Sequence, residues 1–80
     1  MELNDIKPDL TLNAKGLSCP MPLLKTKKAF DRINSGQILE ILSTDPLSKN
    51  DFPGWCMRAG HTFLGIKEEG DLFRFYVKKK

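Results

Sequence analysis

Two cysteines are the residues of this chain best suited to covalent chemistry, and Cys19 has the more reactive setting. It precedes Pro20, which suits the first position of a helix because its φ is fixed and its missing N–H needs no partner there. The sequence therefore predicts Cys19 at a helix N-cap, with Gly16 permitting a tight approach of the preceding chain. Free N–H groups and the positive end of the helix dipole favour a thiolate, and they lower cysteine pKa values to roughly 3.5–7.5.

The surroundings of Cys19 in the sequence favour sulfur transfer over catalysis. A thiolate can take the outer sulfur of a persulfide, and a second thiolate can remove it by the same exchange. That chemistry needs an exposed sulfur and a docking surface, whereas a stand-alone enzyme would need further groups. The sequence has no histidine near Cys19, no glycine-rich phosphate loop and no cysteines at metal-ligand spacing. The pattern predicts a sulfurtransferase-like carrier with no cofactor and no bound metal.

Two other residues that could do chemistry have simpler structural interpretations. Cys56 lies beside Trp55, and a buried core thiol is the favoured interpretation because free cysteine is among the most buried residue types. A disulfide between Cys56 and Cys19 remains open at this point. His61 follows Gly60, and we expect its ring to meet the last carbonyls of a helix. Phe52 and Trp55 are expected in the core rather than at an interface.

Length and composition predict one small domain, residues 1–80 with a core over about 9–78. Hydrophobic residues make up 40% of the chain and charged ones 29%, as in ordinary globular domains. No apolar run approaches the roughly 20 residues that span a bilayer. The acidic, polar start, residues 1–5, argues against a signal peptide, and two cysteines suggest reduced thiols in a cytoplasm. The net charge of +3 is too small to favour direct nucleic-acid binding.

The sequence pattern predicts four strands and two helices. Strands are expected at 9–13, 37–43, 62–68 and 72–78, the last two joined by a turn at 69–71. A first helix is expected from Pro20 to about Ser35, because apolar residues recur at helical spacing up to Gly36. Thr44-Asp45-Pro46 is expected to turn the chain and start a short helical turn, and Asp51 to cap a second helix that ends at Gly60.

This order, β-α-β-α-β-β, predicts an α+β fold: a two-layer sandwich with two helices on one face of a four-stranded mixed sheet. In the last strand, Phe73, Phe75 and Val77 are expected to face the core, with Arg74 and Tyr76 on the opposite face. The first strand leads directly into the helix that follows Cys19. The sheet should therefore hold the reactive position in place.

The residues from Gly16 to Pro22 resemble the G-x-x-C-P-x-P motif of the TusA/SirA family of small sulfur-carrier proteins. The likeness covers about residues 9–78 and includes these further features: Lys27-Lys28, Gly36, Thr44-Asp45-Pro46, the segment Asp51 to Cys56, and the final glycine-centred hairpin. The resemblance implies the same two-layer fold, and a persulfide carried on Cys19.

The resemblance also implies partners: a cysteine desulfurase or rhodanese-type sulfur donor, and a downstream acceptor protein. Family members serve tRNA thiolation, thiosulfate use, sulfur oxidation, molybdenum cofactor synthesis or selenium metabolism. The best-known tRNA-thiolation members have glutamate where this chain has Met21, which weakens the case for that pathway. Transient docking of such partners favours a monomer.

Several residues are candidates for supporting Cys19. Gly16, Pro20, Met21 and Pro22 are expected to shape its loop. Asp45 is either a turn residue or part of a surface near the cysteine. The basic group on the first helix is either a solvated face or a docking strip for an acidic partner. It consists of Lys25, Lys27, Lys28 and Arg32.

Two alternative functions remain. A redox protein would form a reversible Cys19–Cys56 disulfide, which requires Cα atoms within about 7 Å. A nucleic-acid-binding or regulatory module would stack bases on Phe73, Phe75 and Tyr76. The second alternative is weaker, because two of these three aromatic residues are predicted on the core face.

Overall fold

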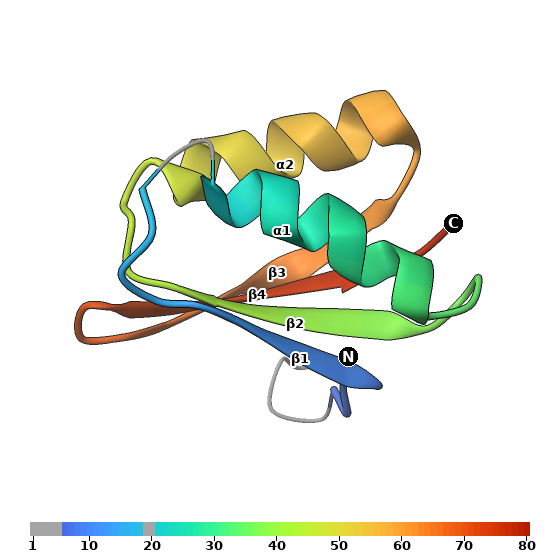
Figure 1. The fold of residues 1–80 in the computed structure, drawn as a ribbon, viewed down its shortest axis with the longest axis horizontal. Coiled ribbons are helices and arrows are strands. Elements are labelled where there is room, and N and C mark those ends of the chain that lie inside the picture. Colours follow the sequence, from blue (N-terminus) through green and yellow to red (C-terminus); the bar gives the residue numbers. More distant parts are fainter. Residues whose placement is uncertain (1–5, 19–20) are drawn as a thin grey trace.

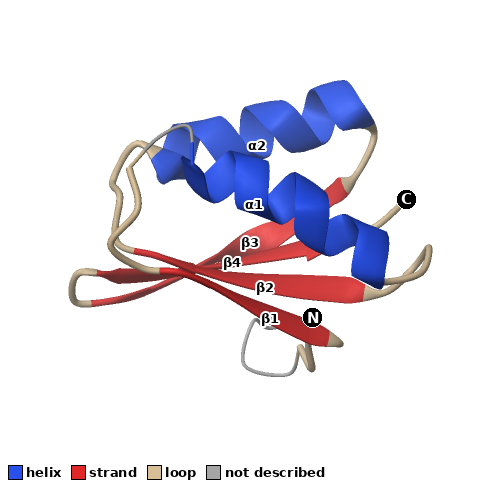
Figure 2. Cartoon of the chain, in the orientation of Figure 1, coloured by secondary structure: helices blue, strands red, loops and turns tan. Residues whose placement is uncertain are grey.

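The computed structural model describes residues 6–18 and 21–80 of the 80-residue chain. Its elements are β1 (Leu10–Ala14), α1 (Met21–Ala29), a 3₁₀ turn (Phe30–Arg32), β2 (Ile38–Ser43), α2 (Ser48–Ala59), β3 (Thr62–Glu69) and β4 (Leu72–Lys78). Both helices cover one face of a four-stranded sheet, as Figure 1 and Figure 2 show. The predicted α+β sandwich and its element order are confirmed.

The sheet has the strand order β1-β2-β4-β3. β1 runs parallel to β2, whereas β4 lies between β2 and β3 and is antiparallel to both. The helix α1 provides the crossover that a parallel pair requires. Two consequences matter for function: β1 and β3 are the edge strands, and the carboxyl ends of β1 and β2 open at the same end of the sheet.

The core lies between the sheet and the two helices. Alternate residues of each strand face inward, and Phe73, Phe75 and Val77 of β4 are buried as predicted. The rings of Phe52 and Phe75 stack with centroids 4.7 Å apart, and this contact packs α2 against β4. Each fully buried side chain of this size stabilises the fold by about 1.5–3 kcal/mol.

The first helix ends earlier than its apolar spacing predicts. After the 3₁₀ turn, Ile33 is already extended, with φ −121° and ψ 161°. Lys79, next to the C-terminus, donates through Nζ to the carbonyls of Phe30 (2.6 Å) and Ile33 (2.8 Å). The Gly36 N–H donates to the Lys79 carbonyl at 2.7 Å. The prediction that the helix runs to about Ser35 was therefore wrong, because the C-terminal residues pair with this segment.

The second helix begins one turn earlier than predicted. Leu47 occupies its N-cap, so Asp51 lies in the first turn and is not the cap. The chain turns tightly before it, since the Ser48 N–H donates to the Asp45 carbonyl at 3.1 Å. The short helical turn expected near Pro46 and the helix expected from Asp51 are thus one continuous helix. Gly60 ends it in the left-handed conformation (φ 82°), as predicted.

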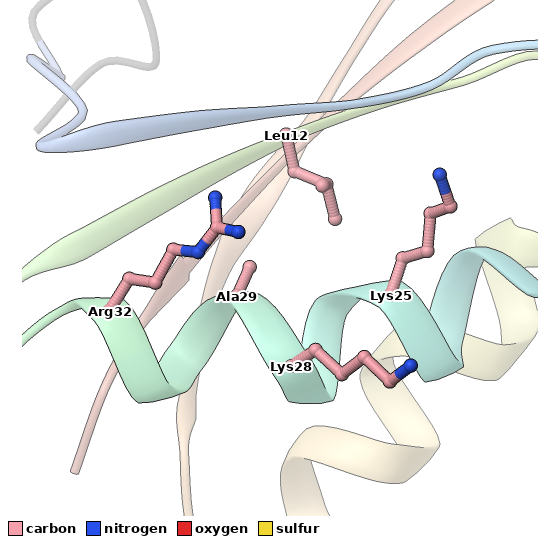
Figure 3. A pocket seen from close by; sticks show the side chains of 5 residues that line it. All are labelled: Leu12, Lys25, Lys28, Ala29 and Arg32. Atoms are coloured by element: carbon pink, nitrogen blue, oxygen red, sulfur yellow. The ribbon is translucent and has the colours of Figure 1, made fainter.

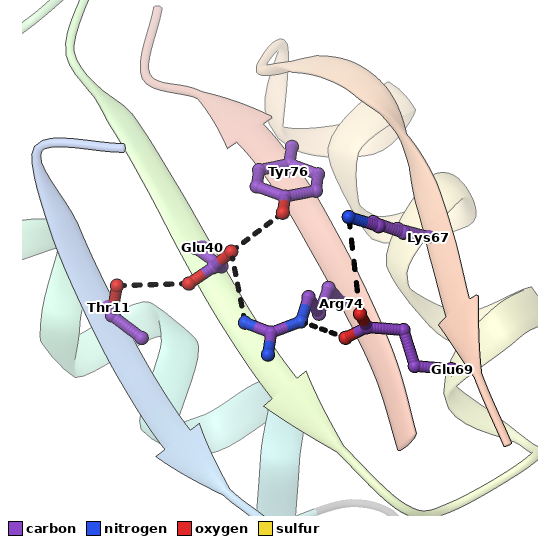
Figure 4. Close-up of polar contacts among 6 residues, drawn as sticks. All are labelled: Thr11, Glu40, Lys67, Glu69, Arg74 and Tyr76. Carbon is purple, nitrogen blue, oxygen red and sulfur yellow. Dashed lines mark hydrogen bonds and ion pairs between the residues drawn. The ribbon is translucent and has the colours of Figure 1, made fainter. Parts of the chain in front are cut away.

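The face of the sheet away from the helices carries an open-face cluster of six polar residues: Thr11, Glu40, Lys67, Glu69, Arg74 and Tyr76 (Figure 4). Glu40 is its centre and is only 8% exposed. Its carboxylate accepts hydrogen bonds from the Thr11 hydroxyl (3.1 Å), the Tyr76 hydroxyl (2.7 Å) and the Arg74 guanidinium (3.5 Å). The strand register places Thr11 and Tyr76 directly opposite Glu40 from either side. The cluster therefore joins β1, β2 and β4 across the sheet.

Among residues 6–18 and 21–80, no helix is both long and apolar enough to cross a membrane.

Candidate functional site

The candidate site lies where β1 and β2 end side by side. Two loops leave the sheet here, one leading to α1 and the other to α2 (Figure 1). The Gly16 N–H donates to the Thr44 hydroxyl at 3.0 Å, so the two loops are joined directly. The sequence predicted Thr44 as part of a turn but not its bond to Gly16, because that bond depends on the parallel pairing of β1 and β2. The loop before the candidate nucleophile is thereby tied to the second loop.

Cys19 and Pro20 lie outside the described residues, so their predicted N-cap and first-turn positions remain predictions. The residues on either side of them are held by hydrogen bonds and by packing against the core. Gly16 has φ 79°, a conformation that only glycine adopts readily, and the Leu17 N–H donates to the Ala14 carbonyl at 3.3 Å. Leu17 also packs against the core. The chain therefore enters the reactive segment from an anchored turn.

The helix that follows is anchored just as firmly. The Met21 N–H donates to the Ser18 carbonyl at 2.9 Å. Pro22 is fully buried, and its carbonyl accepts the Thr26 hydroxyl at 2.8 Å. Met21, by contrast, is 44% exposed. Ser18 and Met21, the described residues on either side of positions 19 and 20, are thus bonded to each other, and Met21 presents an exposed apolar side chain at the start of α1.

Asp45 serves the turn before α2. Its carboxylate accepts the Leu47 N–H at 3.1 Å, and its own N–H donates to the Ser43 hydroxyl at 3.2 Å. Ser43 in turn shares a hydrogen bond with the buried Ser48 hydroxyl at 3.2 Å. The turn role expected for Asp45 is confirmed. Its neighbour Thr44 is bonded to Gly16, three residues before Cys19 in sequence, and the expected surface near the cysteine stays a prediction.

The basic residues predicted as a docking strip line two hollows, and Lys25 and Lys28 belong to both. The first, the edge groove, lies between α1 and β1 and measures about 300 Å³ (Figure 3). Its lining comprises Leu12, Lys25, Lys28, Ala29 and Arg32. The second, the helix hollow of about 390 Å³, is lined by Met21, Leu24, Lys25, Lys27 and Lys28. Lys27 and Arg32 therefore belong to different surfaces, a separation that the sequence analysis missed.

Exposed apolar side chains surround the helix hollow and the turn before α2. Met21 is 44% exposed, Leu24 45% and Leu47 60%. Leu24 and Leu47 were not identified from the sequence as functional residues. The helical period offers a signal for Leu24, because it falls between the buried positions Pro22 and Thr26 and on the opposite side of the helix.

Cys56 is a core residue, as expected. It lies on the inner side of α2 with 1% of its surface exposed. Burial raises the pKa of the Cys56 thiol from 9.0 to about 11, so almost none of it is thiolate at neutral pH. Since the thiolate is the nucleophilic form, Cys56 is poorly suited to attack another sulfur.

His61 also has a structural role, although not through the contact predicted for it. Its ring packs against Phe30 and Trp55, with centroids 4.5 and 5.1 Å away, and its Nδ1 accepts the Lys80 N–H at 3.2 Å. The backbone N–H of His61, not the ring, donates to the Cys56 carbonyl of α2 at 3.0 Å. Burial, together with the charges of Lys80 and Lys79, lowers the pKa of His61.

The aromatic residues considered for base stacking are occupied elsewhere. Phe73 and Phe75 are buried under the helices, and Tyr76 is 5% exposed and bonded to Glu40. The nucleic-acid alternative therefore has no stacking platform on this sheet. In the part of the chain that the structure describes, no group of three or more His, Cys, Asp or Glu side chains is arranged to hold a metal ion.

Comparison with known proteins gives consistent matches. Residues 10–79 match the family model described as sulfurtransferase TusA. The chain is 47% identical to YrkI of Bacillus subtilis, over 92% of this chain and 99% of that protein. It is 42% identical to the sulfur carrier protein TusA of Allochromatium vinosum, over 89% and 93%. The crystal structure of a SirA-like protein from Desulfitobacterium hafniense has the same fold, with a TM-score of 0.75, 18% identity, and coverage of 86% and 95%.

Proposed function

Because this chain belongs to the TusA family of sulfurtransferases, we propose that it is a sulfur carrier in which Cys19 accepts sulfane sulfur and relays it to an acceptor protein. The observation that carries this proposal is that the described residues on both sides of Cys19 and Pro20 are anchored. Hydrogen bonds join Gly16 to Thr44 and Met21 to Ser18. These contacts support a defined position for a thiol between them.

The proposed reaction is an exchange between thiolates and persulfides. The Cys19 thiolate attacks the outer sulfur of a donor persulfide, forming a new S–S bond while the donor's S–S bond breaks. The donor leaves as a thiolate, and Cys19 becomes a persulfide. An acceptor thiolate then attacks the outer sulfur of that persulfide, and Cys19 leaves as a thiolate. Each step breaks one S–S bond and forms another, so there is no net oxidation or reduction. The carrier therefore needs no oxidant, reductant or cofactor.

The helix hollow is the proposed docking surface for donor and acceptor. Met21 and Leu24 provide exposed apolar area close to Cys19 in sequence, and Lys25, Lys27 and Lys28 surround it with positive charge. Apolar contacts at the centre of such a surface contribute affinity, while charges at its rim steer an acidic partner. Asp45 and Leu47 lie on the neighbouring loop and would extend the same surface.

The test is intact-protein mass spectrometry after incubation with a sulfur donor. One arm uses a cysteine desulfurase with cysteine, and the other a rhodanese with thiosulfate. The wild type should gain about 32 Da per sulfur in a form that reductant removes, and Cys19→Ser should gain none. Cys56→Ala should still gain it, and alanine is a better control than serine because a serine hydroxyl would be buried there. Sulfur loading of Cys19→Ser would contradict the proposal.

The same experiment separates the pathways and the redox alternative. The donor that loads Cys19 distinguishes a desulfurase-fed route, such as tRNA thiolation, from thiosulfate use. A redox protein would instead lose about 2 Da as Cys19 and Cys56 join. The burial of Cys56 and its raised pKa argue against that result, because its sulfur would have to leave the core to react.

A further inference from the structure

We propose that the edge groove binds an acidic, extended segment of a partner protein, which adds to β1 as a further strand of the sheet. This proposal depends on the proposed function only in that a carrier must dock other proteins. It concerns the side of α1 that faces β1, although Lys25 and Lys28 also line the helix hollow. It rests on three observations: an open strand edge, a row of cations above it, and a partly uncovered apolar floor.

The first observation is the free edge of β1. This strand of five residues pairs with β2 on one side. Within residues 6–18 and 21–80, no strand pairs with its other side. Such an edge presents backbone N–H and C=O groups that an extended peptide can satisfy, which is the basis of recognition by strand addition.

The second observation is the charge above this edge. Lys25 and Lys28 of α1 and Arg32 of the 3₁₀ turn that follows it are exposed, and Figure 3 shows Lys25 and Arg32 directed toward the sheet. None of the three belongs to an ion pair with another described residue. Their spacing of three and four residues also places them as neighbours on the helix, where like charges repel. The fold therefore keeps a repulsive arrangement of cations that a carboxylate-bearing ligand would relieve.

The third observation is the apolar floor. Leu12 points from β1 toward α1 and is only half-buried, although it packs against the core. Ala29 of α1 lines the opposite side of the edge groove. An added strand would cover Leu12 with its own side chains. The floor therefore suits a peptide chain better than a free small anion, which would leave the leucine exposed.

The dimensions agree with an added strand. Lys25 and Arg32 are seven residues apart, or about 10 Å along a helix. Side chains on one face of an extended strand recur about every 6.7 Å. Two acidic residues separated by one other residue are therefore a few ångströms closer together than Lys25 and Arg32, a difference that these long side chains can span, with Lys28 between them. A second copy of this chain is a poor occupant, because it would bring its own three cations to the same edge.

The test titrates the ¹⁵N-labelled full chain, carrying Cys19→Ser, with a peptide that alternates threonine and glutamate, and follows backbone amide signals by NMR. The expected result is a response at Leu10–Ala14 and at 25–32, and slowed amide exchange at β1. The same peptide with glutamine in place of glutamate should not bind. Binding should weaken about tenfold when Lys25, Lys28 and Arg32 are all replaced by glutamine.

A matched variant replaces Arg58, Lys78 and Lys80 by glutamine, which removes the same net charge from exposed positions elsewhere. Its affinity should stay within about twofold of the parent. Equal weakening in both variants would overturn the proposal, since attraction would then depend on net charge alone. A response at 25–32 without any at β1, or concentration-dependent dimers formed through β1, would also overturn it. Because the chain tested lacks Cys19, this result is independent of whether Cys19 carries sulfur.

Discussion

The open-face cluster and the edge groove lie on opposite sides of the sheet, and both contain several charged side chains. In the open-face cluster every charge has a partner: Glu40 and Glu69 both contact Arg74, and Lys67 lies 4.0 Å from Glu69. In the edge groove, three cations lie together without a carboxylate partner among the described residues. The first arrangement contributes to the stability of this chain, whereas the second leaves charge available to another molecule.

This difference gives a way to separate structural from functional charges in a small domain. Charges that serve the fold should affect stability when they are removed and should have little effect on binding. Charges that serve a partner should do the reverse. The stability predictions that follow test this division, from the largest expected effect to the smallest.

Replacing Glu40 by alanine should cause the largest loss. The variant leaves the Tyr76 hydroxyl and the Arg74 guanidinium without their buried acceptor, and we expect the free energy of unfolding to fall by about 2–3 kcal/mol. Urea unfolding followed by fluorescence measures it. Glu68→Ala is the matched control, because Glu68 is in an exposed ion pair with Lys49 and should change stability little. Similar losses of stability in the two variants would show that Glu40 in the open-face cluster stabilises the fold no more than an exposed ion pair does.

High pH should weaken the same cluster. Burial, the hydrogen bond to Glu40 and the charge of Glu40 raise the pKa of Tyr76 from 10.0 to about 12. The folded state therefore prefers the neutral phenol, so its contribution is complete below pH 10 and is lost as pH rises from 10 to 12. Tyr76 is the only tyrosine, so its absorbance reports the titration directly. A folded-state midpoint near 10 would show that the hydroxyl is not held by Glu40.

Tyr76→Phe should cost less than Glu40→Ala. The phenyl ring remains buried, and only the hydroxyl bond to Glu40 is lost, so the expected decrease in stability is about 1 kcal/mol at neutral pH. Urea unfolding again measures it. The variant should also remove the part of the stability loss between pH 10 and 12 that comes from this residue. An unchanged pH profile would assign that loss to other groups.

The sequence predicted the elements and the core well, because these follow from local patterns. Alternation in 72–78 identified Phe73, Phe75 and Val77 as core residues, and Gly60 marked the end of α2 correctly. The errors arose where distant segments meet. The true end of α1 depends on Lys79, and the start of α2 depends on the turn around Asp45.

The candidate site was predictable only in part, for the same reason. The motif around Cys19 is continuous in sequence, so it could be recognised without knowledge of the fold. The bond from Gly16 to Thr44 joins residues 28 positions apart and requires the parallel pairing of β1 and β2. Glu40 was not identified from the sequence, because its partners depend on a strand order that the pattern did not give. The separation of Lys27 from Arg32 into two hollows depends equally on where β1 lies beside α1.

Replacing Lys25, Lys28 and Arg32 together by glutamine should have the smallest effect on stability. Cations near the end of a helix gain from its dipole, but these three also repel one another at helical spacing. The two effects oppose each other, so we expect the free energy of unfolding to change by no more than about 0.5 kcal/mol. Urea unfolding at low and high salt tests the explanation. Salt should stabilise the parent by screening the repulsion, and this gain should be smaller in the variant. A marked loss of stability at either salt concentration would mean that these cations support the fold, and the contrast with the open-face cluster would fail.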